Sequence, residues 1–110
     1  MALTAEGGSW YIPDMMITLY HVTPRWNMGS ILRRGILASL ARGKKKRVWL
    51  VPAQLLEWAR NHVMDRHRCG YDDVTVICVR VEVPFVRGGP HGTYWLPGNV
   101  TPARIVSAWG

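Results

Sequence analysis

The amino-acid sequence predicts a single α+β domain, because its length, its residue composition and the order of its local patterns agree. With 110 residues, the chain has the size of one domain that can bury its own core. Apolar residues make up 48% and charged residues 19%, which is typical of globular proteins. Local patterns run strand, helix, strand, helix and then mainly strands. We therefore expect a flexible leader over residues 1–14 and one domain over residues 15–110.

The first strand and the first helix are recognised by the residues that end them. Residues 17–22 (ITLYHV) combine β-branched and aromatic side chains, and Pro24 closes the segment, which predicts a strand with His21 near its end. Over residues 27–34, apolar side chains recur at helical spacing, and Gly35 is a typical helix stop. A short helix is therefore expected to lead away from this strand.

A second strand and a longer helix follow. Residues 48–51 (VWLV) predict a short buried strand, and Pro52 suits the first position of a helix because its missing N–H would be unpaired there. This helix is expected to run to about His67 and to lie on a sheet. The face expected to meet water contains Arg60, Asp65 and Arg68.

The second half of the chain predicts mainly strands. Residues 74–83 form the clearest one, since the apolar run through Val79 indicates burial on both faces and Arg80 indicates that the far end emerges. Turns rich in glycine and proline separate two further strand candidates, residues 93–96 and 104–109.

The charge balance indicates an anionic partner. Fourteen lysines and arginines stand against seven aspartates and glutamates, a surplus that attracts phosphates or acidic surfaces. The basic run at residues 42–47 is compatible with a solvated loop and with phosphate contact. Cys69 and Cys78 form no disulfide or zinc pattern, so no metal site and a cytoplasmic location are expected. No apolar run approaches the roughly 20 residues that a bilayer requires.

Three short motifs in order resemble the ADP-ribosyltransferase-like superfamily. They are LYHVT at residues 19–23, SILRRGI at residues 30–36, and the aromatic-bearing strand VWL at residues 48–50 with a helix after it. The resemblance covers about residues 17–106. It implies a compact fold of split, mainly antiparallel β-sheets with two main helices, and it implies NAD as the cofactor.

The resemblance also implies roles for individual residues. His21 would hydrogen-bond the adenosine ribose of NAD with Val22 and Thr23 beside it, and an imidazole suits this role because it can donate and accept. Trp49 stands where the family usually has a tyrosine that stacks on nicotinamide. A purely structural role remains open for both His21 and Trp49.

The third motif departs from the family at the position of its glutamate. Thr93 occupies that position, followed by Tyr94, which is the remaining candidate cofactor contact. A threonine can bind a ribose hydroxyl but cannot act as a base, so it is open whether the protein is an enzyme. The candidate catalytic residues are His21, Trp49 and Thr93.

A related branch of the fold, the RNA 2′-phosphotransferases, uses arginine and histidine residues instead of one glutamate. The basic excess fits that branch, as arginine matches phosphate oxygens well. The candidate phosphate or nucleic-acid contacts are Arg25, Arg42, Lys44, Lys45, Lys46 and Arg47. We therefore expect an NAD-binding ADP-ribosyltransferase-like protein acting on nucleic acid or another phosphate-bearing target.

The alternative is a non-catalytic basic module that binds nucleic acid or a protein. In that case exposed aromatic side chains would stack on unpaired bases beside the basic groups. The candidates for stacking are Trp26, Trp95 and His91.

Overall fold

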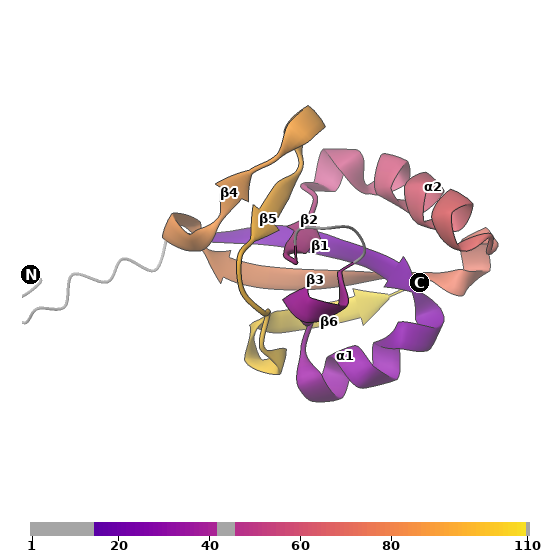
Figure 1. Cartoon of the computed structure of the whole chain (residues 1–110), viewed down its shortest axis with the longest axis horizontal. Helices are drawn as coiled ribbons and strands as arrows, with labels where there is room; N and C mark the ends of the chain where they lie inside the picture. Colours follow the sequence, from indigo (N-terminus) through magenta and orange to yellow (C-terminus); the bar gives the residue numbers. More distant parts are fainter. Residues whose placement is uncertain (1–14, 42–45, 110) are drawn as a thin grey trace, which may run out of the picture.

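The structure is a computed structural model, and it describes residues 15–41 and 46–109. These residues form two three-stranded antiparallel sheets and two α-helices, which confirms the predicted α+β class (Figure 1). The predicted leader, residues 1–14, lies outside the described residues. Within the described ranges, no helix is both long and apolar enough to cross a membrane.

The larger sheet has the strand order β1-β3-β6. Its strands are β1 (Met16–Pro24), β3 (Val74–Glu82) and β6 (Ile105–Trp109). The smaller sheet has the order β2-β5-β4. Its strands are β2 (Val48–Leu50), β5 (Tyr94–Leu96) and β4 (Arg87–Gly88). The helices are α1 (Met28–Arg34) and α2 (Leu56–His67).

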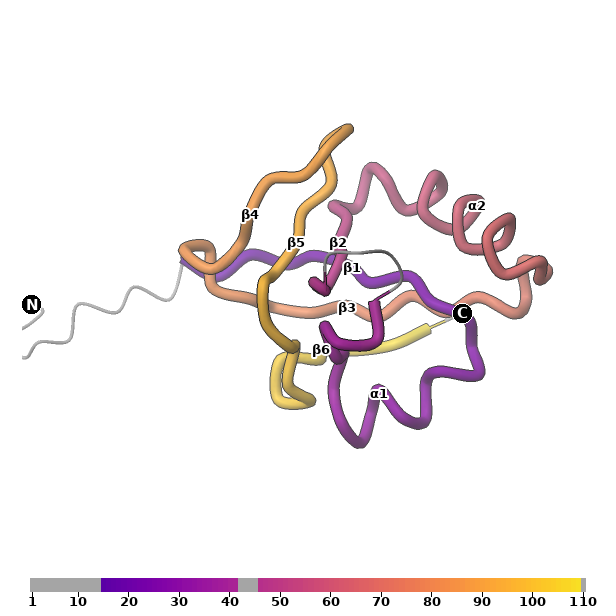
Figure 2. Tube along the Cα trace, viewed as in Figure 1, coloured from indigo at the N-terminus to yellow at the C-terminus, as the bar shows by residue number. Residues whose placement is uncertain are grey.

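The long apolar run predicted as a strand is the centre of the larger sheet. All six residues from Val74 to Val79 are buried, whereas Arg80 is exposed, which confirms the expected burial on both faces. In Figure 1, α2 and α1 lie on opposite sides of these strands, and β4 and β5 run across them. Figure 2 shows that β6 ends beside the junction of β1 and α1, because Trp109 and Val22 both pair with Val76.

Two backbone bridges connect the larger sheet and α1 to the smaller sheet and its neighbouring loop. Tyr20 and Val51 exchange N–H···O bonds of 2.9 and 2.8 Å, which holds the end of β2 against β1. Ile36 and Val100 do the same at 2.8 and 2.9 Å. The first bridge places the residues after Tyr20 next to β2, and it therefore positions the candidate site.

The structure corrects two local predictions. Pro52 does not open the second helix: its backbone is extended (φ −75°, ψ 167°), and a 3₁₀ turn at Ala53–Leu55 comes before α2. Arg60 does not face water, since it is buried with its guanidinium 4.8 Å from the ring centre of Tyr71. Helical periodicity could not reveal this contact, because it depends on how the chain turns back after α2.

Candidate functional site

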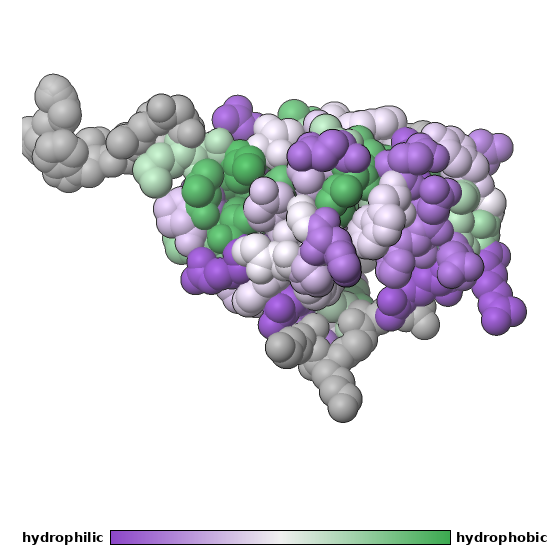
Figure 3. All heavy atoms as spheres, turned by 90° about the horizontal axis from the view of Figure 1, so that it is seen from above, coloured by the Kyte–Doolittle hydropathy of each residue, from purple (hydrophilic) through white to green (hydrophobic). Residues whose placement is uncertain are grey.

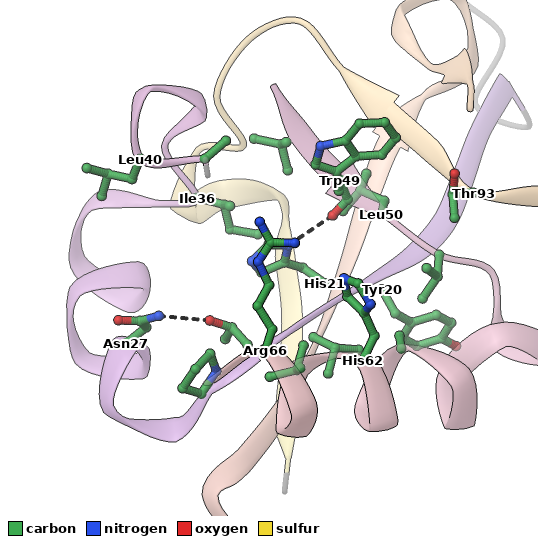
Figure 4. A pocket seen from close by; sticks show the side chains of 18 of the residues that line it. Tyr20, His21, Asn27, Ile36, Leu40, Trp49, Leu50, His62, Arg66 and Thr93 are labelled. Atoms are coloured by element: carbon green, nitrogen blue, oxygen red, sulfur yellow. Dashed lines mark hydrogen bonds between the residues drawn. The ribbon is translucent and has the colours of Figure 1, made fainter. Parts of the chain in front are cut away.

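A cavity of about 590 Å³ lies where the end of β1, strand β2 and helix α2 meet (Figure 4). Its walls come from four parts of the chain: residues 20–24, residues 47–51, the inward side of α2, and the turn from Pro90 to Thr93. Helix α1 and the segment after it close one end. Its volume lies within the range of about 300–1,000 Å³ that is usual for sites that bind small molecules.

His21 is held in the cavity by a hydrogen bond to β2. Its Nδ1 lies 3.0 Å from the carbonyl oxygen of Trp49. Because a carbonyl oxygen only accepts hydrogen bonds, Nδ1 carries the proton, and Nε2 of the neutral ring keeps a free lone pair. Burial lowers the pKa of His21 below its ordinary value of 6.5, and the hydrogen bond to Trp49 opposes this only in part. At pH 7 the ring is therefore neutral, and Nε2 is an acceptor for a hydroxyl or N–H group of a ligand.

Trp49 and Thr93 lie on the same side of the smaller sheet. Trp49 pairs with Trp95, and residues two apart on a strand share a face, so Thr93 lies on the side of Trp49. Both residues line the cavity, and Trp49 keeps 39% of its surface exposed. A methyl group added at Gly89 would lie 2.9 Å from Cζ3 of Trp49 and 2.7 Å from Oγ1 of Thr93, so Gly89 lies against both side chains. His21, Trp49 and Thr93, which are distant in sequence, therefore meet around one cavity.

The hydroxyl of Thr93 already has a fixed partner. It donates a hydrogen bond of 2.6 Å to the carbonyl oxygen of Pro90. Its oxygen lone pairs can accept from a ligand hydroxyl, whereas its proton is held by the turn. Thr93 can therefore position a ligand, but it is not arranged to remove a proton from one.

Of the other predicted cofactor contacts, two line the cavity and one does not. Val22 and Thr23 lie in its wall, and Thr23 Oγ1 accepts a hydrogen bond of 3.0 Å from Asn27. Tyr94 is not among the residues that line the cavity and packs against the core. Because Tyr94 pairs with Leu50, its side chain lies on the opposite face of the sheet from Trp49. The structure thus places Tyr94 away from the cavity, and its cofactor contact stays a prediction.

Among the predicted phosphate contacts, Arg47 lies at the cavity. Its guanidinium carbon is 3.6 Å from the ring centre of Trp95 and 5.6 Å from that of Trp49. Within the part of the chain that the structure describes, its N–H groups have no hydrogen-bond partner. Stacking of this kind fixes the guanidinium plane and leaves its N–H edge free for an anion.

The remaining predicted basic contacts lie elsewhere. Arg25 donates a hydrogen bond of 3.0 Å to the carbonyl of Asp72, and Lys46 donates one of 2.9 Å to the carbonyl of Ala41; neither lines the cavity. The other three positions lie outside the described residues: Arg42, Lys44 and Lys45.

Helix α2 contributes four polar or aromatic side chains to the cavity that no motif of the sequence predicted. Trp58, His62, Arg66 and His67 all line the cavity, and Figure 4 shows the side chains of His62 and Arg66 pointing from α2 into it. All four histidines of the chain line this one cavity, since His21 and His91 are also in its wall. The i, i+4, i+8 spacing of Trp58, His62 and Arg66 was a sequence signal that could have indicated a shared helix face.

The cavity wall is basic. Arg47 and Arg66 line it, and no described aspartate or glutamate does. Side chains of one sign around a concave surface raise the local concentration of oppositely charged ligands. No three histidines, cysteines, aspartates or glutamates among the described residues are grouped closely enough to hold a metal ion. The arrangement therefore suits an anionic organic ligand.

The sequence matches no protein-family model, and it has no significant match among curated proteins. The residues and geometry of the cavity are therefore the basis for proposing a function.

Proposed function

We propose that the cavity binds NAD and that this protein is ADP-ribosyltransferase-like, acting on nucleic acid or another phosphate-bearing target. The observation that carries this proposal is that a neutral imidazole with a free acceptor and a half-exposed indole share one cavity with a basic wall. These three features match the three parts of a dinucleotide: sugar hydroxyls, a flat ring and a pyrophosphate.

Each of these parts has a candidate partner in the cavity. Nε2 of His21 can accept a hydrogen bond from a ribose hydroxyl, since Nδ1 already donates to Trp49. The indole of Trp49 can stack on the nicotinamide ring. The free N–H groups of Arg47 can hold the pyrophosphate, because Trp95 fixes the guanidinium plane.

Bound NAD would supply an N-glycosidic bond whose cleavage releases nicotinamide. Around that bond, Thr93 could accept a hydrogen bond from the ribose, because its lone pair is free although its proton is bound to Pro90. The described wall contains no carboxylate, so the side-chain bases that line it are imidazole nitrogens. His62 and His91 are both exposed lining residues, and either could receive the proton that an acceptor hydroxyl loses on transfer.

The absence of a carboxylate from the described wall also favours a second candidate function, binding without turnover. In that case the protein would be a non-catalytic basic module that recognises nucleic acid or a protein. Incubating the protein with NAD and a DNA or RNA oligonucleotide separates the two functions. A mass gain of one ADP-ribose, or loss of a 2′-phosphate, supports turnover, and unchanged substrates support binding alone.

Titration calorimetry with NAD tests the binding site itself. Replacing His21 by alanine removes one hydrogen bond, and replacing Trp49 by alanine removes one stacking surface, so each should weaken NAD binding roughly tenfold. Gly89→Ala should also weaken binding, because the new methyl group would displace Trp49 and Thr93.

Gly88→Ala is the matched control, since a methyl group there meets nothing within 4 Å, and it should bind NAD like the wild-type protein. No detectable NAD binding by the wild-type protein would refute the proposal. Equal affinities in the Gly89 and Gly88 variants would show that NAD binds elsewhere.

A further inference from the structure

We propose that Trp58, His62 and Arg66 of α2 form a binding surface for single-stranded nucleic acid at the rim of the cavity, with a base stacked on an outer face of the Trp58–His62 ring pair and a phosphate held by Arg66. We call these three residues the α2 stripe. If the protein transfers ADP-ribose as proposed, the α2 stripe identifies single-stranded nucleic acid as the acceptor, and this part of the inference rests on the proposed function. Binding of the strand itself requires no NAD.

The helix geometry aligns the three side chains. They are spaced by four residues, so each is displaced by only about 40° around the helix axis from the one before, and the stripe spans about 12 Å. All three are exposed and also line the cavity, which places them at its rim. Figure 3, which views this side of the molecule, shows hydrophilic side chains gathered over the end where α2 lies.

Trp58 and His62 form a preformed stacking platform. Their ring centres are 5.3 Å apart and their planes differ by 14°, so the rings are stacked in parallel. Even so, 47% of the Trp58 surface is exposed. An exposed, oriented aromatic pair is suited to receive another flat ring, and stacking on an aromatic side chain contributes about 1–3 kcal/mol per nucleic-acid base.

Arg66 supplies the charge beside this platform. Within the described residues it has no hydrogen bond, ion pair or ring contact, so its N–H groups are available to a phosphate. The acidic residues of α2 are Glu57 and Asp65, and neither lines the cavity.

A second aromatic pair lies close to Arg66 along the chain. The ring of Trp26 contacts that of His67 edge to face, with centres 6.2 Å apart, and 64% of Trp26 is exposed. By contrast, Trp95 is partly buried with the Arg47 guanidinium over its ring. Of the tryptophans predicted to stack on bases, Trp26 is therefore better placed than Trp95.

The combination of stacked rings and a free guanidinium favours an unpaired strand. A duplex hides the faces of its bases, so it could use Arg66 but not the platform. An acidic peptide could likewise use Arg66 and leave the exposed Trp58–His62 pair unused. Of these three polymers, only a single strand offers exposed flat rings and phosphates together.

Fluorescence anisotropy with a labelled 12-nucleotide oligothymidylate, and separately with oligouridylate, tests the surface. Trp58→Ala should weaken binding by about 5- to 150-fold, and Trp58→Phe, which keeps a stacking ring, should restore much of the affinity. His62→Ala should weaken binding in the same direction. Arg66→Gln should weaken it as well, whereas Arg33→Gln on α1, an exposed arginine that does not line the cavity, should not.

The outcomes separate this inference from the proposed function. If the protein binds the oligonucleotide in a way that depends on Trp58 but does not bind NAD, the nucleic-acid surface is supported and the proposed function is refuted. If the protein binds NAD but shows no oligonucleotide binding that depends on Trp58, the nucleic-acid surface is refuted. Competition by polyglutamate or by a duplex of equal length as strongly as by the single strand would also overturn it.

Discussion

A single hydrogen bond decides what His21 can do. Its Nδ1 is bound to the Trp49 carbonyl, which fixes the ring orientation and leaves Nε2 as an acceptor. Burial keeps the ring neutral by lowering its pKa. A protonated ring would present a donor at Nε2 instead, so the same position would recognise a ligand differently at low pH.

The lowered pKa of His21 predicts a pH-dependent contribution to stability. The unfolded chain, with an ordinary histidine pKa of about 6.5, takes up a proton more readily than the folded protein does. The contribution of neutral His21 to the free energy of unfolding is therefore complete above about pH 6.5. It is lost as the pH falls from there through the lower pKa of His21 in the folded protein. Urea unfolding from pH 7.5 to pH 5 should show a steeper loss of stability in the wild-type protein than in His21→Asn.

Asparagine is a suitable replacement because its side-chain N–H can approach the position of Nδ1 but does not titrate. The other three histidines are common to both proteins, so their contributions largely cancel in the difference. Parallel stability curves for the two proteins would contradict the assignment.

The end of α1 shows how one element is fixed against another. Gly35 ends the helix with a positive φ of 83°, and its N–H donates to Ile31 at 2.7 Å. A side chain at this position would place its Cβ 2.0 Å from the carbonyl oxygen of Val100. The bridge between Ile36 and Val100, which closes one side of the core, therefore requires a glycine before it.

Gly35→Ala should therefore reduce the free energy of unfolding by roughly 2–4 kcal/mol, because it combines a strained backbone conformation with displacement of a bridged strand segment. Gly98→Ala is the matched control, because nothing lies within 4 Å of its added methyl group. Its effect should stay within about 0.5 kcal/mol. Chemical denaturation of both variants gives the comparison, and similar stabilities would show that the contact with Val100 relaxes without loss.

Across the whole molecule, the chain is basic, and two of its arginines, Arg47 and Arg66, line the concave site. The chain carries a net charge of +7, and its cavity presents arginines and histidines with no described carboxylate. Exposed apolar side chains occur both at the cavity, as Leu40 and Trp58, and away from it, as Val83 and Phe85 between β3 and β4. The net charge and the sign of the cavity wall thus favour binding of an anion.

The net charge predicts that oligonucleotide affinity falls with salt. For single strands, the logarithm of the binding constant falls with the logarithm of salt concentration by about 0.7 for each phosphate neutralised. Replacing Lys44, Lys45 and Lys46 together by glutamine should weaken binding and flatten this slope by up to about 2. Anisotropy titrations at several salt concentrations measure both quantities, and a slope near zero in the wild-type protein would argue against phosphate contacts.

Much of the fold could be predicted from the sequence because the signals were local. Proline and glycine mark where β1 and α1 end, and an uninterrupted apolar run is a signal of a strand covered on both faces, as β3 is. The burial of Arg60 and the orientation of Tyr94 could not be predicted, because each depends on which neighbour packs against an already formed element.

The sequence by itself determined the α+β class, the approximate positions of both helices and of every strand except β4, and the choice of His21, Trp49 and Thr93 as candidates. Only the tertiary structure decided that these residues line one cavity, and that α2 contributes Trp58, His62 and Arg66 to its rim. The physical reason is the bridge between Tyr20 and Val51, which brings His21 and Trp49, 28 residues apart, within one hydrogen bond. A local pattern carries no information about such a contact, because it forms only when two distant strands pair.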